Sequence, residues 1–213
     1  SLQPKTSATI TERKLTDFPE GTQQCSSLTE NSDGRQLSFG CRTDSTFHLG
    51  VYDFKTGTTR LVSNVGFKFD HLQFHHHRPN ILSISRSYPA GTDWAPLDPA
   101  APPHARIWFV NIDTGIPVPA FYQVPGELVT HECWWVNDQM TFLGGHHRVG
   151  NREEGSVKVY DFKTGDIRII GAGAWLEDAT AQQLSQVNWW HACGSPDGKW
   201  VVDLHQSASA STG

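Results

Sequence analysis

The chain has 213 residues, of which 37% are hydrophobic and 18% charged, and its formal net charge is −5. This length is enough for one sizeable domain with a core. The acidic balance, without a basic stripe, gives no electrostatic footprint for nucleic acid. No apolar run approaches the roughly 20 residues that cross a bilayer. We therefore expect neither nucleic acid nor membrane as a partner.

Strand and turn signals begin near residue 23 and continue through the first third of the chain. Apolar and β-branched segments alternate there with Asp-Gly and Thr-Gly connectors, which favour tight hairpins because glycine accepts a positive φ. Four strands joined by hairpins form a meander. The expected strands are Cys25–Leu28, Gln36–Phe39, Phe47–Asp53 and Thr59–Val62.

The meander recurs along the chain. The hexapeptide Tyr52–Gly57 is repeated letter for letter at Tyr160–Gly165, and Ile107–Gly115 echoes it. Repeats of roughly 40–50 residues with four strands each are typical of a β-propeller. The sequence therefore predicts an all-β fold, a propeller of four-stranded antiparallel blades. The predicted blades cover residues 23–65, 66–123, 124–172 and, in part, 183–206 of a single domain over 1–213.

Three and a half blades cannot close a ring, and open sheet edges favour aggregation. We therefore expect a partial propeller, whose remaining blades come from further sequence, from oligomerisation or were lost by truncation. The oligomeric state stays open. The chain has no Asn-x-Ser/Thr glycosylation sequon, which favours a cytoplasmic setting without deciding it. The four cysteines lack zinc-ribbon spacing, so we interpret them as small buried hydrophobes rather than as disulfides.

Three histidines recur at one place in successive units. His71, His131 and His191 are each expected to open a strand that leads to a turn and a second strand. A residue that recurs at one place in radially packed repeats recurs at one place in space. The pattern predicts that the three imidazoles gather near the propeller axis.

Three segments of the chain carry a further signal, and they are His104–Asn111, Thr130–Trp135 and His191–Gly198. Together they resemble the oligogalacturonate lyases (polysaccharide lyase family 22), which are seven-bladed β-propellers. A weaker match, His71–Pro79, fits the preceding blade, and the resemblance covers roughly residues 23–206, equivalent to the middle blades of that family.

The resemblance implies cleavage of an acidic oligosaccharide by β-elimination. The proton on C5 of a uronate becomes acidic when the adjacent carboxylate is neutralised by a metal ion or a guanidinium. A base then removes this proton, and the oxygen on C4 departs. Histidine, with an ordinary pKa of about 6.5, suits the base, and arginine suits the carboxylate.

By position, Arg106 and His131 match the catalytic pair of the resembled family. We assign His131 as the base and Arg106 as the carboxylate neutraliser, although these roles could be exchanged. His191 matches a ligand of the family's manganese site, so Mn²⁺ or another divalent cation is implied. The other ligands have no match before Gly213 and would come from outside this chain.

Several further residues receive a predicted role. His71, Gln73 and His146 are candidate substrate contacts, whereas the tract His75–His77 is interpreted as a solvated loop. One tryptophan of each adjacent pair should be core, and the other could form a platform for a sugar ring. Three residues are interpreted as structural: Glu132, Cys133 and Cys193.

Two alternatives stay open. The polar segment that follows the second blade's inner strands in the resembled family is replaced here by Ser85–Pro89, so another uronate, such as glucuronate linked to rhamnose, could be the substrate. A non-catalytic propeller that binds a protein or a glycan through the same face is the second alternative, because a propeller fold does not determine function.

Overall fold

The computed structural model is built of β-strands in the part of the chain that it describes. Within that part there is no helix with the length and apolarity needed to cross a membrane. The predicted all-β architecture is confirmed. The described residues are 14–15, 17, 20–24, 27–87, 95–148, 152–153, 156–172 and 188–206.

The described strands form three complete antiparallel sheets and one two-stranded sheet, here called blades one to three and the half-blade. Blade one contains β1 (Thr22–Gln24), β2 (Thr29–Glu30), β3 (Gln36–Thr43), β4 (Thr46–Asp53) and β5 (Thr58–Asn64). Blade two contains β6 (Phe69–Phe74), β7 (Ile81–Arg86), β8 (Ile107–Asn111) and β9 (Pro117–Pro119). Blade three contains β10 (Glu127–Trp134), β11 (Gln139–Arg148), β12 (Arg152–Glu153), β13 (Ser156–Asp161) and β14 (Ile167–Ala172). The half-blade contains β15 (Asn188–Gly194) and β16 (Val201–Gln206).

The first strand of blade one differs from its prediction. Both β1 and β2 pair with β3, whereas Ser27 and Leu28 lie between them outside any strand, and Leu28 is exposed. Cys25 lies outside the described residues. The predicted inner strand is therefore split in two.

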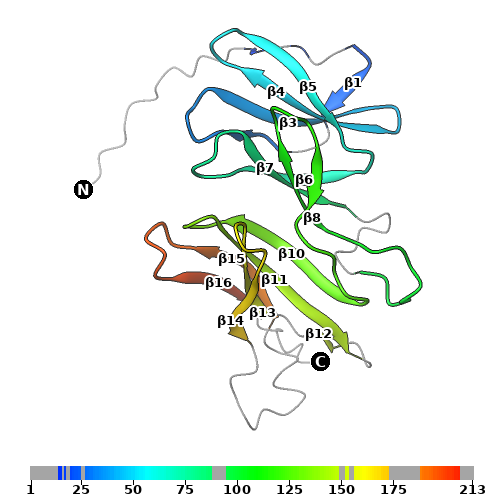
Figure 1. The fold of residues 1–213 in the computed structure, drawn as a ribbon, viewed down its shortest axis with the longest axis vertical. Helices are drawn as coiled ribbons and strands as arrows, with labels where there is room; N and C mark the ends of the chain where they lie inside the picture. The colour runs from blue at the N-terminus through cyan, green and yellow to red at the C-terminus, as the bar shows by residue number, and fades with distance from the viewer. Residues whose placement is uncertain are drawn as a thin grey trace, which may run out of the picture.

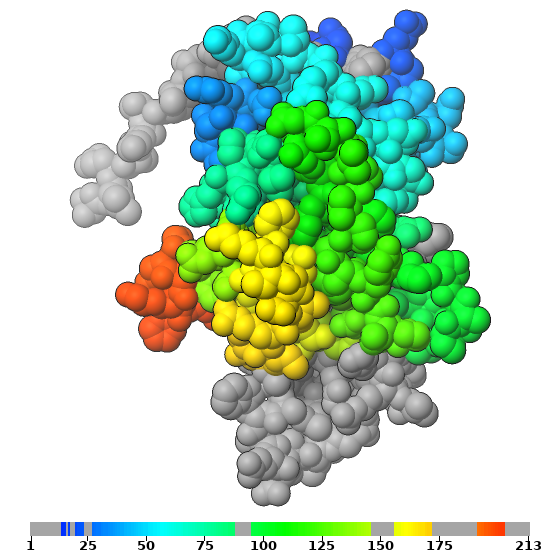
Figure 2. Space-filling view, viewed as in Figure 1, coloured from blue at the N-terminus to red at the C-terminus, as the bar shows by residue number. Residues whose placement is uncertain are grey.

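Blade one lies at the top of the view, blade two below it and blade three below that, whereas the half-blade lies to the side of blade three (Figures 1 and 2). The inner strand β6 contacts β2 and β3 of blade one and β10 of blade three, and β15 contacts β10 and β11. The first strands of successive blades are therefore neighbours, as radial stacking requires. That the blades belong to a larger ring stays a prediction.

The hydrophobic core lies between the facing surfaces of adjacent blades. One cluster joins Leu49 and Val51 of β4 to strands of blade two, and a second joins Phe109 of β8 to Trp134 and Phe142 of blade three. Because each blade buries one face against the next, apolar burial holds the stack together and positions the inner strands.

The repeated hairpins share one hydrogen-bond pattern. The Asp53 carboxylate accepts hydrogen bonds from the backbone N–H groups of Lys55 and Thr56, and Gly57 donates to the Asp53 carbonyl oxygen over 2.8 Å. Asp161 and Gly165 repeat this pattern in blade three. The recurrence in the sequence thus reflects a turn that closes the outer hairpin of blades one and three.

The equivalent glycine in blade two, Gly115, packs against the backbone of blade one. Gly115 has a φ of +70°, and a Cβ there would lie 2.2 Å from the carbonyl oxygen of Val62 in blade one. Gly165 has a φ of +78°, and a Cβ there would meet nothing within 4 Å. An alanine at either position would strain the backbone, but only an alanine at position 115 would also clash with the neighbouring blade.

Gly115→Ala is expected to lower the free energy of unfolding by about 3 kcal/mol, and Gly165→Ala by about 1 kcal/mol, because both strain the backbone but only the first adds a clash. Urea unfolding of both variants measures the difference. Equal losses in the two variants would contradict the packing of the β8–β9 turn on blade one.

Candidate functional site at the inner strands

The three predicted histidines occupy the same unusual backbone position in three neighbouring blades. His71, His131 and His191 have φ values of 47°, 52° and 63°. Each lies at a β-bulge, where the pairing register of the inner strand shifts. The histidines therefore lie inside β6, β10 and β15 and do not open these strands, which corrects the sequence-based expectation. Non-glycine residues in the left-handed region are uncommon, and such strain clusters at functional sites.

The bulges bring the three imidazoles to one open cavity of about 530 Å³. The ring centroids of His71 and His131 lie 6.5 Å apart, and those of His131 and His191 lie 4.0 Å apart. The cavity is lined by Ser27, Leu28, His71, Leu72, Gln73, His131, Glu132, Cys133, His191, Ala192 and Cys193. The three histidines, which recur every 60 residues in the sequence, thus lie together at one cavity.

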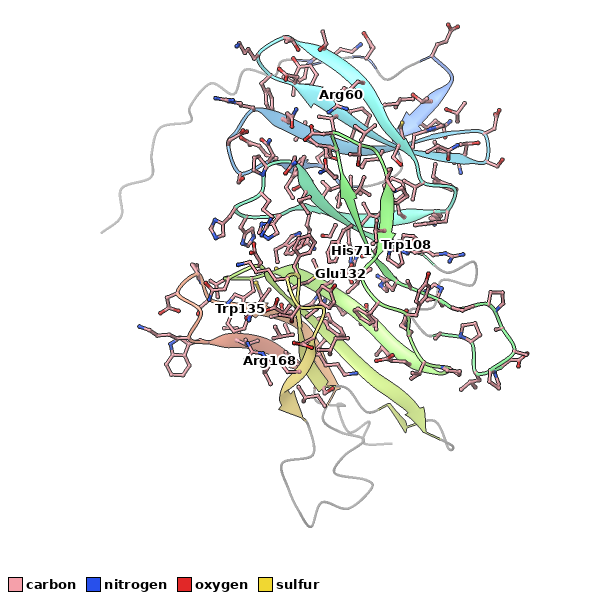
Figure 3. All side chains as sticks on the ribbon, in the orientation of Figure 1. Arg60, His71, Trp108, Glu132, Trp135 and Arg168 are labelled. Atoms are coloured by element: carbon pink, nitrogen blue, oxygen red, sulfur yellow. The ribbon has the colours of Figure 1, made fainter. Side chains whose placement is uncertain are left out.

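A buried carboxylate supports this cavity from behind. Glu132 has a fully buried side chain, and its Oε1 lies 2.9 Å from Nδ1 of His71 (Figure 3). Its Oε2 lies 3.6 Å from Nε of Arg106, whose side chain is only 4% exposed. His71 is 40% exposed and faces the cavity. The network therefore runs from a buried guanidinium through a carboxylate to an accessible imidazole.

The network shifts the protonation of both partners. The hydrogen bond to Glu132 raises the pKa of His71, although partial burial opposes it. Burial alone would raise the pKa of Glu132, but the hydrogen bond from His71 and the charge of Arg106 hold it below its usual value. The arrangement therefore favours the charged imidazolium of His71 and the ionised carboxylate of Glu132.

Arg106 is placed differently from its expected role. It immediately precedes β8, lies behind Glu132 and does not line the cavity. One of its guanidinium nitrogens also donates to the carbonyl oxygen of Arg86 over 3.4 Å. Among the cavity residues, the guanidinium therefore approaches Glu132 and not the open space that His71 faces.

The predicted metal ligand His191 is exposed and lies in the cavity. Among the residues that the structure describes, no three His, Cys, Asp or Glu side chains form a group that could hold a metal ion. One imidazole is not a useful site for a divalent cation. The described residues therefore do not fit manganese, and ligands would have to come from elsewhere.

The predicted substrate contacts fall into different places. Gln73 lines the cavity, but its amide donates to the Glu132 carbonyl oxygen over 2.6 Å and accepts from the Trp134 N–H over 3.3 Å. It thus joins β6 to β10. The backbone of His146 pairs with Glu127, and its side chain lies outside the described residues.

Two other interpretations need correction. His75 is buried rather than solvated, and its Nε2 lies 2.8 Å from Oδ1 of Asp138, whereas His76 and His77 are exposed. Trp134 and Trp135 are both buried, so neither is a platform for a sugar. The pairing of blades, rather than alternation along one strand, buries both rings.

The cysteine interpretation was wrong for Cys193, which is exposed, and Cys133 is only half-buried. Both line the cavity. Burial raises the pKa of Cys133 to about 12, with a further contribution from the hydrogen bond to Cys193.

Glu132 is the functional candidate that sequence reasoning set aside as structural. Strict alternation along a strand would point His131 and Glu132 to opposite faces. The bulge places both at the cavity, because two residues of β10 there oppose one residue of β11. The shared spacing of the three histidines was the signal that could have revealed a repeated bulge.

Comparison with known proteins supports the fold. No protein-family model matches the sequence, and no characterised protein matches it in a sequence search. Among solved structures, an oligogalacturonate lyase from Vibrio parahaemolyticus is similar with a TM-score of 0.55 and 14% identity, over 91% of this chain and 65% of its own. An oligogalacturonate lyase in complex with manganese has a TM-score of 0.50 and 13% identity, over 89% of this chain and 64% of its own.

The β-propeller domain of the trilobed protease from Pyrococcus furiosus is also similar, with a TM-score of 0.54 and 12% identity over 91% of this chain and 52% of that domain. TolB from Acinetobacter baumannii has a TM-score of 0.52 and 13% identity, over 88% of this chain and 38% of its own. Proteins of different function share this likeness, so it establishes the architecture alone. The chain is a β-propeller protein, and it spans slightly less than two thirds of the two lyases.

Proposed function

We propose that this chain carries the active-site face of a lyase that cleaves uronate-containing oligosaccharides by β-elimination, with oligogalacturonate as the first candidate substrate. The observation that carries the proposal is the convergence of three imidazoles from neighbouring blades on one cavity, with a buried carboxylate fixing one of them. The similarity to two lyases of this name supports the choice of substrate.

In the proposed reaction, His71 binds the uronate carboxylate. Its contact with Glu132 favours the charged imidazolium, which lies partly exposed at the cavity. Pairing with this charge withdraws electron density from C5 and makes its proton more acidic. Arg106 holds Glu132 in place and compensates its charge from behind.

His131 then acts as the base. It lines the cavity between His71 and His191, so a sugar bound on His71 would present its C5 proton to this ring. The proton moves to the imidazole, its electron pair forms the C4–C5 double bond, and the bond from C4 to the glycosidic oxygen breaks. The leaving oxygen takes up a proton from water, and the His131 imidazolium then returns the C5 proton to the solvent. No step is assigned to a metal ion.

Incubation of the purified protein with uronide oligosaccharides tests the proposal, because the 4,5-unsaturated product absorbs ultraviolet light. Oligogalacturonate is expected to give the larger rise in absorbance, and a panel with rhamnosyl-glucuronate separates the two lyase specificities. Binding of the oligosaccharides without any rise in absorbance would overturn the lyase proposal and favour a glycan-binding propeller.

A further inference from the structure

Two cysteines face each other across the boundary between blade three and the half-blade. Cys133 on β10 and Cys193 on β15 have their Sγ atoms 3.6 Å apart. Both line the cavity, and Cys193 is exposed to solvent. The thiols are therefore in contact with each other and accessible to small molecules.

Their proximity follows from the repeat. Each cysteine comes two residues after a bulge histidine, at the position where regular pairing resumes in its blade. The same position in blade two is Gln73, which bonds to the backbone of β10 instead. Equivalent positions on neighbouring inner strands lie side by side, so two thiols at this position must meet.

Hydrogen bonds hold blade three against the half-blade on both sides of Cys193. The hydroxyl of Thr141 donates to the carbonyl oxygen of Ala192 over 3.3 Å. The indole N–H of Trp135 donates to the backbone carbonyl oxygen of Ser195 over 2.8 Å. A disulfide bond is about 2.05 Å long, so each sulfur must move by less than about 1 Å.

We propose that Cys133 and Cys193 are a modification site, at which a small disulfide such as oxidised glutathione converts them into a reversible disulfide between blade three and the half-blade. The exposed Cys193 thiolate attacks one sulfur of the oxidant, which releases one glutathione and leaves a mixed disulfide. The Cys133 sulfur then displaces the second glutathione. Two thiols are oxidised, and the two electrons and two protons leave on the two reduced glutathione molecules.

The bond would have two consequences. It closes a loop of 60 residues between blade three and the half-blade, whose contacts are otherwise non-covalent. It also lies beside His131 and His191, so it restricts the cavity at the point where these rings are 4.0 Å apart. The site is thus independent of the proposed lyase reaction but adjacent to it.

Incubation with oxidised glutathione, followed by denaturation and thiol counting, tests this site. Of the four cysteines, two are expected to lose their free thiols, and peptide mapping should join Cys133 to Cys193. The midpoint of thermal unfolding should rise by about 10 °C and return after reduction. Cys41→Ser, which removes a buried cysteine elsewhere, should leave this response unchanged.

Three outcomes would overturn the proposal: four free thiols after oxidation, a stable glutathione adduct on Cys193, or a link that involves Cys25 or Cys41. Cys133→Ser and Cys193→Ser should each abolish the rise in unfolding midpoint. The thiol count and the peptide map of the unaltered protein decide the matter even if a variant fails to fold.

Discussion

Replacement of His131 by asparagine is expected to lower kcat for uronate cleavage by about 10³-fold, because the amide cannot accept the C5 proton. Asparagine is preferred to alanine because His131 has a φ of 52°, a conformation that asparagine tolerates. The variant should therefore unfold close to the midpoint of the unaltered protein. Initial rates of absorbance increase at saturating substrate measure the effect.

His77→Asn is the matched control, because this exposed imidazole lies outside the cavity. Its activity should equal that of the unaltered protein. Added imidazole should partly restore turnover to His131→Asn by replacing the missing base. Full activity of His131→Asn would remove this residue from the chemical step and assign the base to another ring of the cavity.

Glu132→Gln is expected to lower the free energy of unfolding by about 3–5 kcal/mol, because it leaves the buried Arg106 guanidinium without its ionised partner. It should also raise KM, since His71 loses the carboxylate that favours its charged form. Urea unfolding measures the first effect, and steady-state kinetics at fixed pH measure the second.

Glu127→Gln is the matched control on the same strand. Its carboxylate pairs with Lys158 over 3.0 Å, and both side chains are 11% exposed, but neither residue lines the cavity. Removing this charge should also lower stability, yet leave KM unchanged. The same rise in KM for both variants would show that destabilisation alone accounts for it.

The stability difference between the unaltered protein and Glu132→Gln should depend on pH. Because the pKa of His71 is raised in the folded protein, this residue contributes its full stabilisation below its pKa in the unfolded chain, about 6.5. That stabilisation is lost as pH rises through the folded pKa. Because the pKa of Glu132 is lowered in the folded protein, this residue contributes its full stabilisation above its pKa in the unfolded chain, about 4.3. That stabilisation is lost as pH falls through the folded pKa. The difference should therefore be largest between about pH 4.5 and 6.5 and should narrow on either side. A difference that is constant with pH would contradict the ion pair.

Local chemistry explains why much of the fold was predictable. The turn at Asp53–Gly57 needs an acceptor that caps two backbone N–H groups and a glycine at positive φ, and both requirements are visible in the residue types. Its exact recurrence at 161–165 therefore identified the blade repeat. The spacing of the histidines likewise indicated the cavity, since residues at equivalent positions of adjacent repeats lie side by side in the fold.

The roles within the cavity were less predictable, because they depend on which side chains face each other across different blades. Arg106 and Glu132 are 26 residues apart in the chain, and their buried contact exists only when blade two packs on blade three. The burial of His75 against Asp138 has the same origin.

By itself, the sequence determined the strand-and-hairpin repeat, the all-β architecture and the periodic placement of the three histidines, because turn geometry and side-chain alternation act between near neighbours. Only the tertiary structure decided that a bulge at His131 also brings Glu132 to the cavity, that Arg106 is buried behind it, and that Cys133 and Cys193 touch. These contacts are set by the register shift within each inner strand and by the packing of one blade on the next, which no short stretch of residues encodes.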